Sequence, residues 1–367
     1  MDAALHLAEP QLVVPGANRP FAIADFVAAP NEPLRVRATS ASDLPSGGAG
    51  TLFAHPLWLR TYGAENLLAV EGVGARLVFA RRGNELRHLG RLLSFEPACI
   101  DFLTERLLRL PGVGFVVFDD VHVAGGLDKR PGRAAFRYQN NWQLPLNGPG
   151  EAAAPSRQTA QATARKLRGL TRERPSVRVG FDRNPSEAFL RRVVALNRAK
   201  IEAQGRRHGI DETEFGRLRA ISAELGHGAA LTEGDDLIAG DLICIADNRA
   251  YFLTGGYEPD FQRFSPGMIT LSHAIEACRR RGILDFNLLW GDGVYKQRLG
   301  GRCQPLVTIL SRRSPATLLR PAYLAALSRF GWLHLKRALK PMLARLKGLA
   351  PEKPSADAKG DLPSASG

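Results

Sequence analysis

Two stretches of this chain hold residues whose types and spacing could do chemistry. The first covers residues 255–268 and has the sequence Gly-Gly-Tyr-Glu-Pro-Asp-Phe-Gln-Arg-Phe-Ser-Pro-Gly-Met. It joins an apolar strand to an amphipathic helix, so the chain enters that helix with free backbone N–H groups and a positive dipole end. This arrangement predicts an anion site suited to a pyrophosphate group.

Individual residues of this stretch support the anion site. Ser265 can cap the helix, Pro266 suits its first position, and Gly267 lets a ligand approach the backbone closely. The guanidinium of Arg263 can add a charge-assisted contact. An ordinary Ser-Pro-Gly helix start contains the same residues, and the spacing alone leaves that alternative open.

The second stretch covers residues 285–298, Asp-Phe-Asn-Leu-Leu-Trp-Gly-Asp-Gly-Val-Tyr-Lys-Gln-Arg. A buried strand ends at Trp290 and a Gly-Asp-Gly turn follows. Asp292, Tyr295 and Lys296 then lie at the carboxyl edge of a strand, where α/β proteins usually bind their ligands. There Tyr can act as a general acid, Asp as a base and Lys as a phosphate contact. The alternative is that the Asp caps a short helix and the Tyr packs.

The elements that must position these two stretches alternate between strands and helices. Period-2 and continuous apolar runs predict strands, and apolar residues three or four apart predict helices. The predicted strands are 177–181, 229–232, 237–246, 249–254, 283–289 and 306–310, and the predicted helices are 187–202, 215–225 and 265–281. This alternation indicates a mixed α/β domain.

The N-terminal half has a similar order of elements. The sequence predicts strands at 67–70, 75–80 and 85–89, a helix at 97–110 and a buried strand at 114–118. The helix at 97–110 leads into a buried strand just as the helix at 265–281 leads into the strand at 283–289. The order strand, strand, helix, strand therefore occurs twice, which predicts an internal duplication of architecture.

Composition divides the chain into six segments. They are a partly ordered lead-in (1–50), an N-terminal half (51–146), a linker with a basic helix (147–170), a C-terminal domain (171–312), a basic amphipathic helical segment (313–350) and a polar tail predicted to be disordered (351–367). The small residues around 147–160 indicate the linker.

The segment 313–350 combines apolar residues at helical spacing with many cations and no acidic residue, and Pro321 and Pro341 interrupt it. Such a composition is typical of a helix that lies on an anionic membrane surface. A terminal helix that packs on the domain with a solvated basic face fits equally well.

The 367 residues suffice for two domains with ordinary cores, and the net charge of +14 attracts polyanions such as nucleic acid, anionic lipid or a phosphate-bearing cofactor. The four cysteines form no CxxC pair, so we expect no metal site. The sequence has no signal peptide pattern and no long uninterrupted apolar run. We expect a cytoplasmic protein, with peripheral contact at the inner membrane through 313–350.

Taken together, the two stretches resemble the signature of GNAT-superfamily acyltransferases, in the CelD-like branch associated with cellulose and exopolysaccharide biosynthesis. The basic helix near residue 165, Asn197-Arg-Ala-Lys200 and Gly240 also match the order of that family. The resemblance covers about residues 170–312. It implies an α/β (α+β) GNAT fold and, because members resemble FemAB-like proteins, two GNAT-like halves in tandem with a degenerate N-terminal half.

The resemblance also implies an acyl-CoA donor, acetyl-CoA or another acyl-CoA, and an amine or hydroxyl acceptor. The residues it places at the CoA pyrophosphate, together with the cations predicted to contact phosphate, are Arg263, Phe264, Ser265, Pro266, Gly267, Met268 and Lys296. In this family a bulged strand, here Tyr251 to Gly255, polarises the thioester carbonyl with a backbone N–H. Tyr295 is then the candidate acid, and Asp292 or Glu258 the candidate base.

We therefore expect an acyl-CoA-dependent N- or O-acyltransferase of polysaccharide or cell-envelope biosynthesis, with a small-molecule or glycan- or lipid-linked acceptor and no specific nucleic acid partner. Two alternatives stay open. One is a FemAB-like aminoacyltransferase that uses aminoacyl-tRNA, which a long helical-hairpin insertion would mark. The other is a non-catalytic GNAT-like partner that docks on a membrane-bound synthase through its basic tail.

Overall fold

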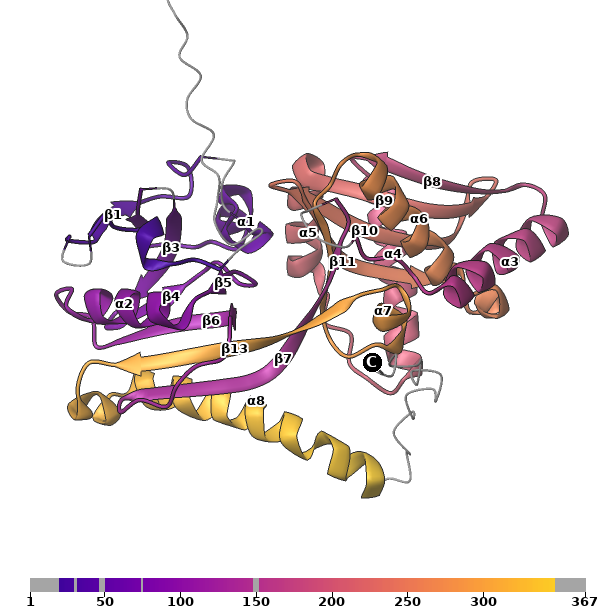
Figure 1. Cartoon of the computed structure of the whole chain (residues 1–367). Helices are drawn as coiled ribbons and strands as arrows, with labels where there is room; N and C mark the ends of the chain where they lie inside the picture. The colour runs from indigo at the N-terminus through magenta and orange to yellow at the C-terminus, as the bar shows by residue number, and fades with distance from the viewer. Residues whose placement is uncertain (1–19, 30–31, 46–49, 74, 148–151, 347–367) are drawn as a thin grey trace, which may run out of the picture.

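The computed structural model describes residues 20–29, 32–45, 50–73, 75–147 and 152–346. Within them, one mixed sheet runs through the molecule and helices cover it (Figure 1). The predicted mixed α/β class is therefore confirmed. The predicted tail at 351–367 and the first part of the lead-in lie outside the described residues.

The strands are β1 (Arg35–Thr39), β2 (Leu67–Glu71), β3 (Arg76–Arg82), β4 (Glu85–His88), β5 (Ser94–Phe95), β6 (Phe115–Val123), β7 (Arg133–Pro145), β8 (Val177–Arg183), β9 (Gly226–Glu233), β10 (Asp236–Ala246), β11 (Arg249–Tyr257), β12 (Asp285–Trp290) and β13 (Arg302–Arg312). The sheet joins them in the order β1-β2-β3-β4-β6-β13-β7-β12-β11-β10-β9-β8, and β5 pairs with β6 alone. The outer strands on each side therefore belong to different halves of the sequence.

The α-helices are α1 (Pro56–Thr61), α2 (Pro97–Leu108), α3 (Arg157–Glu173), α4 (Glu187–Ala203), α5 (Glu212–Leu225), α6 (Pro266–Arg280), α7 (Val294–Arg298) and α8 (Pro321–Leu346). Short 3-10 helices are η1 (Ile23–Asp25), η2 (Leu52–Ala54), η3 (Pro259–Phe264) and η4 (Pro315–Leu319). Most predicted helices and strands are present with bounds shifted by a few residues. The basic helix begins earlier than expected, at Arg157.

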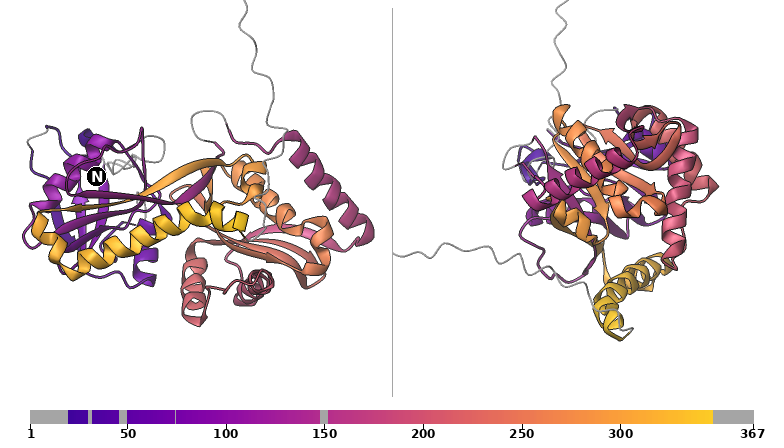
Figure 2. Two further views of the ribbon diagram at one scale, coloured as in Figure 1. Left: turned by 90° about the horizontal axis from the view of Figure 1, so that it is seen from below. Right: turned by 90° about the vertical axis from the view of Figure 1, so that its right-hand side faces the viewer.

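Each half contains the same parallel unit. In the C-terminal half, β11 and β12 are parallel and α6 connects them; in the N-terminal half, β4 and β6 are parallel and α2 lies between them in the chain. Helices α4 and α6 pack on opposite faces of the C-terminal part of the sheet, because successive residues of β10 contact one helix and then the other (Figures 1 and 2). The predicted duplication of architecture is present in the structure.

Two long strands connect the halves. Strand β7 pairs with β12 of the C-terminal half, β13 pairs with β6 of the N-terminal half, and β7 and β13 pair with each other. The sequence did not predict β7, because polar side chains occupy much of it and obscure the alternation. They are Arg137, Gln139, Asn140, Asn141 and Gln143. Pairing on both sides stabilises this strand in place of an apolar pattern.

The basic C-terminal segment differs from the prediction. One continuous helix, α8, begins at Pro321, and Pro341 lies inside it, so only the first proline delimits the helix. Its inner face packs on β6, β7 and β13 through Tyr323, Ala326 and Phe330 (Figure 2). The lead-in also contains a strand, β1, that pairs with β2. No helix among the described residues has both the length and the apolar character needed to cross a membrane.

Candidate active site

The C-terminal half opens where β11 leaves β12. The two strands pair only at Arg249–Asp285, Ala250–Phe286 and Tyr251–Asn287, and beyond these pairs they have no common register. At the same level β11 has a bulge against β10, since Thr254 faces Leu242 and Phe252 faces Ile243. The residue between them, Leu253, has no opposite residue on β10. A bulged, splayed strand therefore lies where the sequence placed one.

A cavity of about 580 Å³ lies at this opening. Residues from α4, β10, β11, the start of α6 and α7 line it. They are Asn197, Lys200, Ile210, Asp241, Phe252, Leu253, Thr254, Gly255, Gly256, Tyr257, Gln262, Ser265, Gly267, Met268, Leu271 and Tyr295. The cavity has room for a small ligand group and presents few charged side chains.

Two glycines of β11 allow its close packing at the cavity. A Cβ on Gly255 would collide with the carboxyl of Asp241, and a Cβ on Gly256 would collide with the backbone of α4 at Asn197. The absence of side chains brings α4 within reach of the strand, so the Asn197 side chain donates a hydrogen bond to the Gly255 carbonyl at 2.8 Å. His208 lies 3.1 Å from the other end of the same amide.

Asp241 is the buried carboxyl of the site. Its side chain lies in the middle of β10, is only 3% exposed, and has one oxygen without a hydrogen-bond partner among the described residues. Burial raises the pKa of Asp241 to about 7, while a hydrogen bond with Thr270 and the charge of Lys200 act in the opposite direction. A carboxyl with this pKa can accept a proton near neutral pH.

Tyr295 lies on α7 and lines the same cavity. Burial, followed by the nearby charge of Asp241, raises the pKa of its phenol to about 12. The phenol therefore stays protonated at neutral pH and can donate a proton or a hydrogen bond. Asp241 and Tyr295 have the complementary protonation states that an acid–base pair requires.

The start of α6 has the features of an anion site. Ser265 adopts a left-handed conformation (φ 53°) before the helix, and Gly267 and Met268 line the cavity next to it. The ammonium of Lys166, on α3, contacts the Ser265 hydroxyl and has no carboxylate partner among the described residues. A helix N-terminus, a hydroxyl and an unneutralised ammonium together fit a pyrophosphate.

The other predicted pyrophosphate residues around the start of α6 are engaged in contacts within the protein. Phe264 is buried in a core cluster and Pro266 occupies the first position of the helix. The guanidinium of Arg263 forms an ion pair with Glu173 and lies over the ring of Phe264. Arg263 therefore connects η3 with α3.

The three candidate catalytic residues do not come together. Tyr295 lines the cavity, whereas Glu258 forms an ion pair with Arg192 outside it. Asp292 accepts a hydrogen bond from Asn140 at 2.9 Å and lines a different cavity. The geometry favours Asp241 over both predicted carboxylates as a base for chemistry in this cavity.

Lys296 also has a different environment from the one expected for a phosphate contact. Its buried ammonium donates hydrogen bonds to the carbonyls of Leu288, Leu289 and Trp290, at 2.7, 3.0 and 2.6 Å. These carbonyls lie where β12 has separated from β11 and keeps only β7 as a ladder partner. Burial lowers the pKa of Lys296 to about 8. Lys296 thus satisfies the free edge of the splayed strand and holds the opening in shape.

Sequence reasoning missed Asp241 and Lys200 as site residues. A signal for Asp241 was present, because it is the single acid within the apolar run Ile238-Ala-Gly-Asp-Leu-Ile-Cys-Ile245. An acid inside a fully apolar strand must be neutral, paired or functional. Lys200 faces the cavity only because α4 crosses β11 at its glycines, which no local pattern indicates.

Comparison with known protein families identifies this half of the molecule. Residues 157–297 match the family model described as an acetyltransferase (GNAT) domain. The chain therefore carries a GNAT-superfamily acetyltransferase domain. The match begins at the first residue of α3 and ends within α7, so it includes Lys166, Asp241, Ser265 and Tyr295.

Solved structures resemble a larger part of the chain. FemX matches with a TM-score of 0.51 and 11% identity, over 76% of this chain and 96% of FemX. L-PGS from Bacillus licheniformis matches with a TM-score of 0.40 and 13% identity, over 69% of this chain and 85% of that one. A tandem GNAT protein from the clavulanic acid biosynthesis pathway matches with a TM-score of 0.37 and 10% identity, over 77% and 99%.

The likeness to FemX concerns the fold alone at this identity, and it extends over both halves of the present chain. No curated protein sequence matches this one significantly.

Proposed function

We propose that this protein is an acyl-CoA-dependent acyltransferase, with acetyl-CoA as the first donor to test. The observation that carries the proposal is the cavity at the splayed strands, which combines an anion-binding helix start with a neutral-range carboxyl and a protonated phenol. The match of residues 157–297 to a GNAT domain supports the same conclusion.

In the proposed reaction, Ser265, the start of α6 and Lys166 bind the pyrophosphate of the donor. The acceptor nitrogen or oxygen attacks the thioester carbonyl carbon, and Asp241 takes the proton that the acceptor loses. A backbone N–H near the bulge at Leu253 stabilises the oxyanion. The carbon–sulfur bond then breaks, and the thiolate of CoA takes a proton from Tyr295.

Titration calorimetry with acetyl-CoA tests the donor site. Gly267→Glu places a carboxylate at the start of α6 and should raise the Kd for acetyl-CoA at least about tenfold, because it repels the pyrophosphate. Gly216→Glu is the matched control, since Gly216 lies in α5 outside the cavity and a side chain there meets no other atom. Binding by the parent and the control but not by Gly267→Glu supports the proposal.

The finer assignment concerns the acceptor. We propose an amine or hydroxyl of a small molecule or of a glycan- or lipid-linked compound in polysaccharide or cell-envelope biosynthesis. The resemblance of 255–268 and 285–298 to CelD-like proteins supports this assignment. Release of free CoA thiol from acetyl-CoA, measured with a panel of amino sugars and polysaccharide fragments, would identify the acceptor class.

An aminoacyltransferase that uses aminoacyl-tRNA is the second candidate, and the net charge of +14 favours it. Against it, the consecutive helices α4 and α5 both bury side chains in the core, so neither forms a projecting hairpin. Transfer from aminoacyl-tRNA without any heat from acetyl-CoA would establish this candidate.

A lack of heat with acetyl-CoA and longer acyl-CoAs, together with no aminoacyl transfer, would overturn both enzymatic proposals. The remaining proposal would then be a non-catalytic partner of a membrane-bound synthase. That proposal predicts membrane association that is lost when residues 315–367 are deleted.

A further inference from the structure

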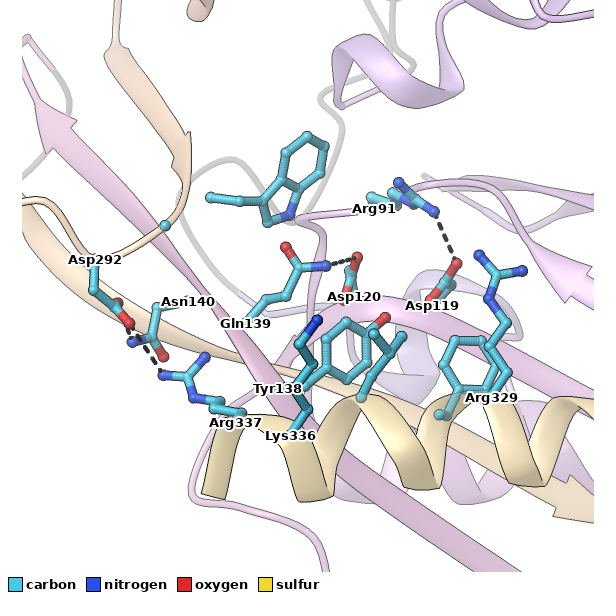
Figure 3. Close-up of a pocket in the computed structure, with 14 residues that line it drawn as sticks. Arg91, Asp119, Asp120, Tyr138, Gln139, Asn140, Asp292, Arg329, Lys336 and Arg337 are labelled. Atoms are coloured by element: carbon cyan, nitrogen blue, oxygen red, sulfur yellow. Dashed lines mark hydrogen bonds and ion pairs between the residues drawn. The ribbon is translucent and has the colours of Figure 1, made fainter. Parts of the chain in front are cut away.

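A second, larger cavity lies between the two halves of the molecule. Its volume is about 890 Å³, and Figure 3 shows side chains that enter it from several directions. The lining comes from the N-terminal half, from β7, from the turn after β12 and from α8. The residues are Arg91, Asp119, Asp120, Tyr138, Gln139, Asn140, Trp290, Gly291, Asp292, Arg329, Phe330, Leu333, Lys336 and Arg337. None of them lines the first cavity.

The α8 side of this cavity is positively charged. Arg337 lies 3.8 Å from Asp292, and Arg91 lies 3.1 Å from Asp119, so these two cations have acidic partners. Arg329 and Lys336 have no carboxylate within 4.0 Å among the described residues. Figure 3 shows both rising from α8 toward the cavity. This pair provides a binding point for a phosphate-sized anion.

The opposite side of the cavity is rich in groups that bind hydroxyls. The Gln139 amide donates a 3.4 Å hydrogen bond to Asp120, and the Asn140 amide donates a 2.9 Å hydrogen bond to Asp292 (Figure 3). Asp120 is only 2% exposed and has a left-handed backbone (φ 49°). Burial, followed by the charge of Asp119, raises the pKa of Asp120 to about 6.

Aromatic faces complete the cavity. Trp290 and Tyr138 line it, Phe330 (1% exposed) stacks under Tyr138, and the buried indole N–H of Trp290 has no hydrogen-bond partner among the described residues. Flat aromatic surfaces pack against the C–H face of a sugar ring, and an unpaired buried N–H requires an acceptor. The cavity therefore has an anion end, hydroxyl partners and stacking surfaces.

We propose that this cavity is a binding site for a phosphorylated sugar, with the phosphate at Arg329 and Lys336 and the hydroxyls at Asp120, Gln139 and Asn140. The site does not depend on the acyl transfer proposed above, because its residues are separate from the donor cavity. A free sugar phosphate and the headgroup of a lipid-linked sugar phosphate share this chemistry.

Titration of the full chain with glucose 1-phosphate tests the site. Arg329→Ala/Lys336→Ala should raise the Kd at least about tenfold, because each cation contributes a charge-assisted contact. The matched control is Arg313→Ala/Arg320→Ala, which removes two exposed cations near α8 that do not line the cavity. Asp120→Asn keeps the backbone conformation, since Asn tolerates a positive φ, and should weaken binding of glucose 1-phosphate more than binding of inorganic phosphate.

Equal Kd values of the two double variants for glucose 1-phosphate would overturn the proposal. It would also be overturned if the parent bound neither glucose 1-phosphate nor vesicles that carry the same headgroup. Inorganic phosphate that binds as tightly as glucose 1-phosphate would overturn the sugar part. Stronger retention on phosphatidylcholine vesicles that contain a prenyl-phosphate-linked glucose would assign the lipid-linked source. Binding of the soluble compound alone would assign the free one.

The outer face of α8 carries a second, independent inference. Leu324, Trp332 and Leu335 lie on the side of the helix opposite to its packed face, and Trp332 is 64% exposed. Leu319, in η4 just before the helix, is 82% exposed. Leu324, Trp332 and Leu335 form an apolar strip on one face of α8, and exposed apolar surfaces of this kind often mark interaction sites.

The segment that carries this strip contains many cationic residues and no acidic residue. The residues from 312 to 346 contain no Asp or Glu. Arg313 and Arg320 are exposed cations just before α8, and Arg329 and Lys336, which also border the second cavity, are exposed cations of α8 itself. An apolar strip flanked by positive charge is complementary to an anionic lipid surface rather than to a basic or neutral protein partner. We infer that η4 and α8 dock on anionic membranes.

Sedimentation with vesicles tests this second inference. The parent should bind phosphatidylglycerol-containing vesicles and not phosphatidylcholine alone, and Trp332→Asp/Leu335→Asp should lose at least about tenfold in partitioning. Val73→Asp is the matched control, because Val73 is 74% exposed on a turn far from α8 in the sequence. Equal partitioning of all three proteins would contradict the inference, and so would self-association of the parent through this strip in the absence of lipid.

Discussion

The N-terminal and C-terminal halves both contain two parallel strands with a helix between them, but only in the C-terminal half do these strands diverge to form a cavity. In the C-terminal half, β12 separates from β11 after three residue pairs and a cavity follows. In the N-terminal half, β6 pairs with β4 over residues 85–88 and then continues against β5 at Ser94–His122 and Phe95–Val123. A short strand therefore covers the edge of β6 that would otherwise border an opening.

In the N-terminal half, side chains fill the position that corresponds to the cavity of the C-terminal half. His88 is fully buried among the rings of Phe79, Phe95 and Phe118, with centroid distances of 5.2 to 5.6 Å. The helix that follows, α2, has Glu96 at its N-cap, where α6 has Ser265. An acid at this position repels a phosphate. The duplicated scaffold therefore persists without the site, so the site depends on few residues.

Removal of the buried carboxyl should have the largest effect on the C-terminal half. Asp241→Asn should lower the acyl-transfer rate about 100-fold or more, because it removes the proposed base. The measurement is CoA release at saturating donor. A rate within about threefold of the parent would contradict a role for Asp241 as base and return the search to other groups.

The same variant should be more stable than the parent at high pH. The pKa of Asp241 is raised from 3.8 to about 7 on folding, so its ionisation destabilises the fold progressively from pH 4 to pH 7 and constantly above. Asp241→Asn should therefore gain on the order of 4 kcal/mol at pH 8 and nothing at pH 4. Thermal unfolding at the two pH values checks this, and a gain that is equal at both would exclude titration as its cause.

The close contact of β11 with α4 gives the next effect in size. Gly256→Ala should lower the free energy of unfolding by about 2–3 kcal/mol, because the new methyl group collides with the backbone of α4 at Asn197. Gly216→Ala is the control and should stabilise by about 0.5–1 kcal/mol, since its methyl group meets empty space on a helix. Urea unfolding of both variants separates strain at the cavity from a general effect of Ala.

A smaller effect is expected in the N-terminal half, where β5 and aromatic side chains close the position of the cavity. Neither ring nitrogen of His88 has a hydrogen-bond partner among the described residues, and burial lowers its pKa to about 3. The stability that the neutral ring provides is complete above pH 6.5 and is lost as the pH falls toward 3. His88→Leu should stabilise by about 1 kcal/mol at pH 7 and by more at pH 5. A loss of stability at both pH values would indicate a packing role that only the imidazole can fulfil.

The smallest effect should come from the helix start of the closed half. Glu96→Gln removes the repulsive charge but leaves the aromatic filling in place, so the number of acetyl-CoA molecules bound per chain should stay at about one. Calorimetric stoichiometry measures this. Two molecules per chain would show that the acid alone closes the second site.

The scaffold was more predictable from the sequence than the site. Buried strands and the amphipathic helix α6 leave strong periodic signals, which is why the segments 249–254, 265–281 and 283–289 were found. Strand β7 left none, because its partners are distant in the sequence and its side chains are polar. No local pattern indicates the partners of Lys296 for a related reason, since they are carbonyls exposed by the divergence of two strands.

Strand β7 pairs with the C-terminal half and strand β13 pairs with the N-terminal half. This crossed pairing constrains how the protein can be synthesised and divided. Strand β6 needs β13 beside it, where Val307 faces Val121, so the sheet of the N-terminal half stays incomplete until residues 302–312 have left the ribosome. An isolated fragment of residues 157–297 would lack both β7 and β13 and would expose the edge of β12 to unintended pairing. Nascent chains of this protein should therefore depend on chaperones until β13 is available, and the two halves form one unit of inheritance and of expression.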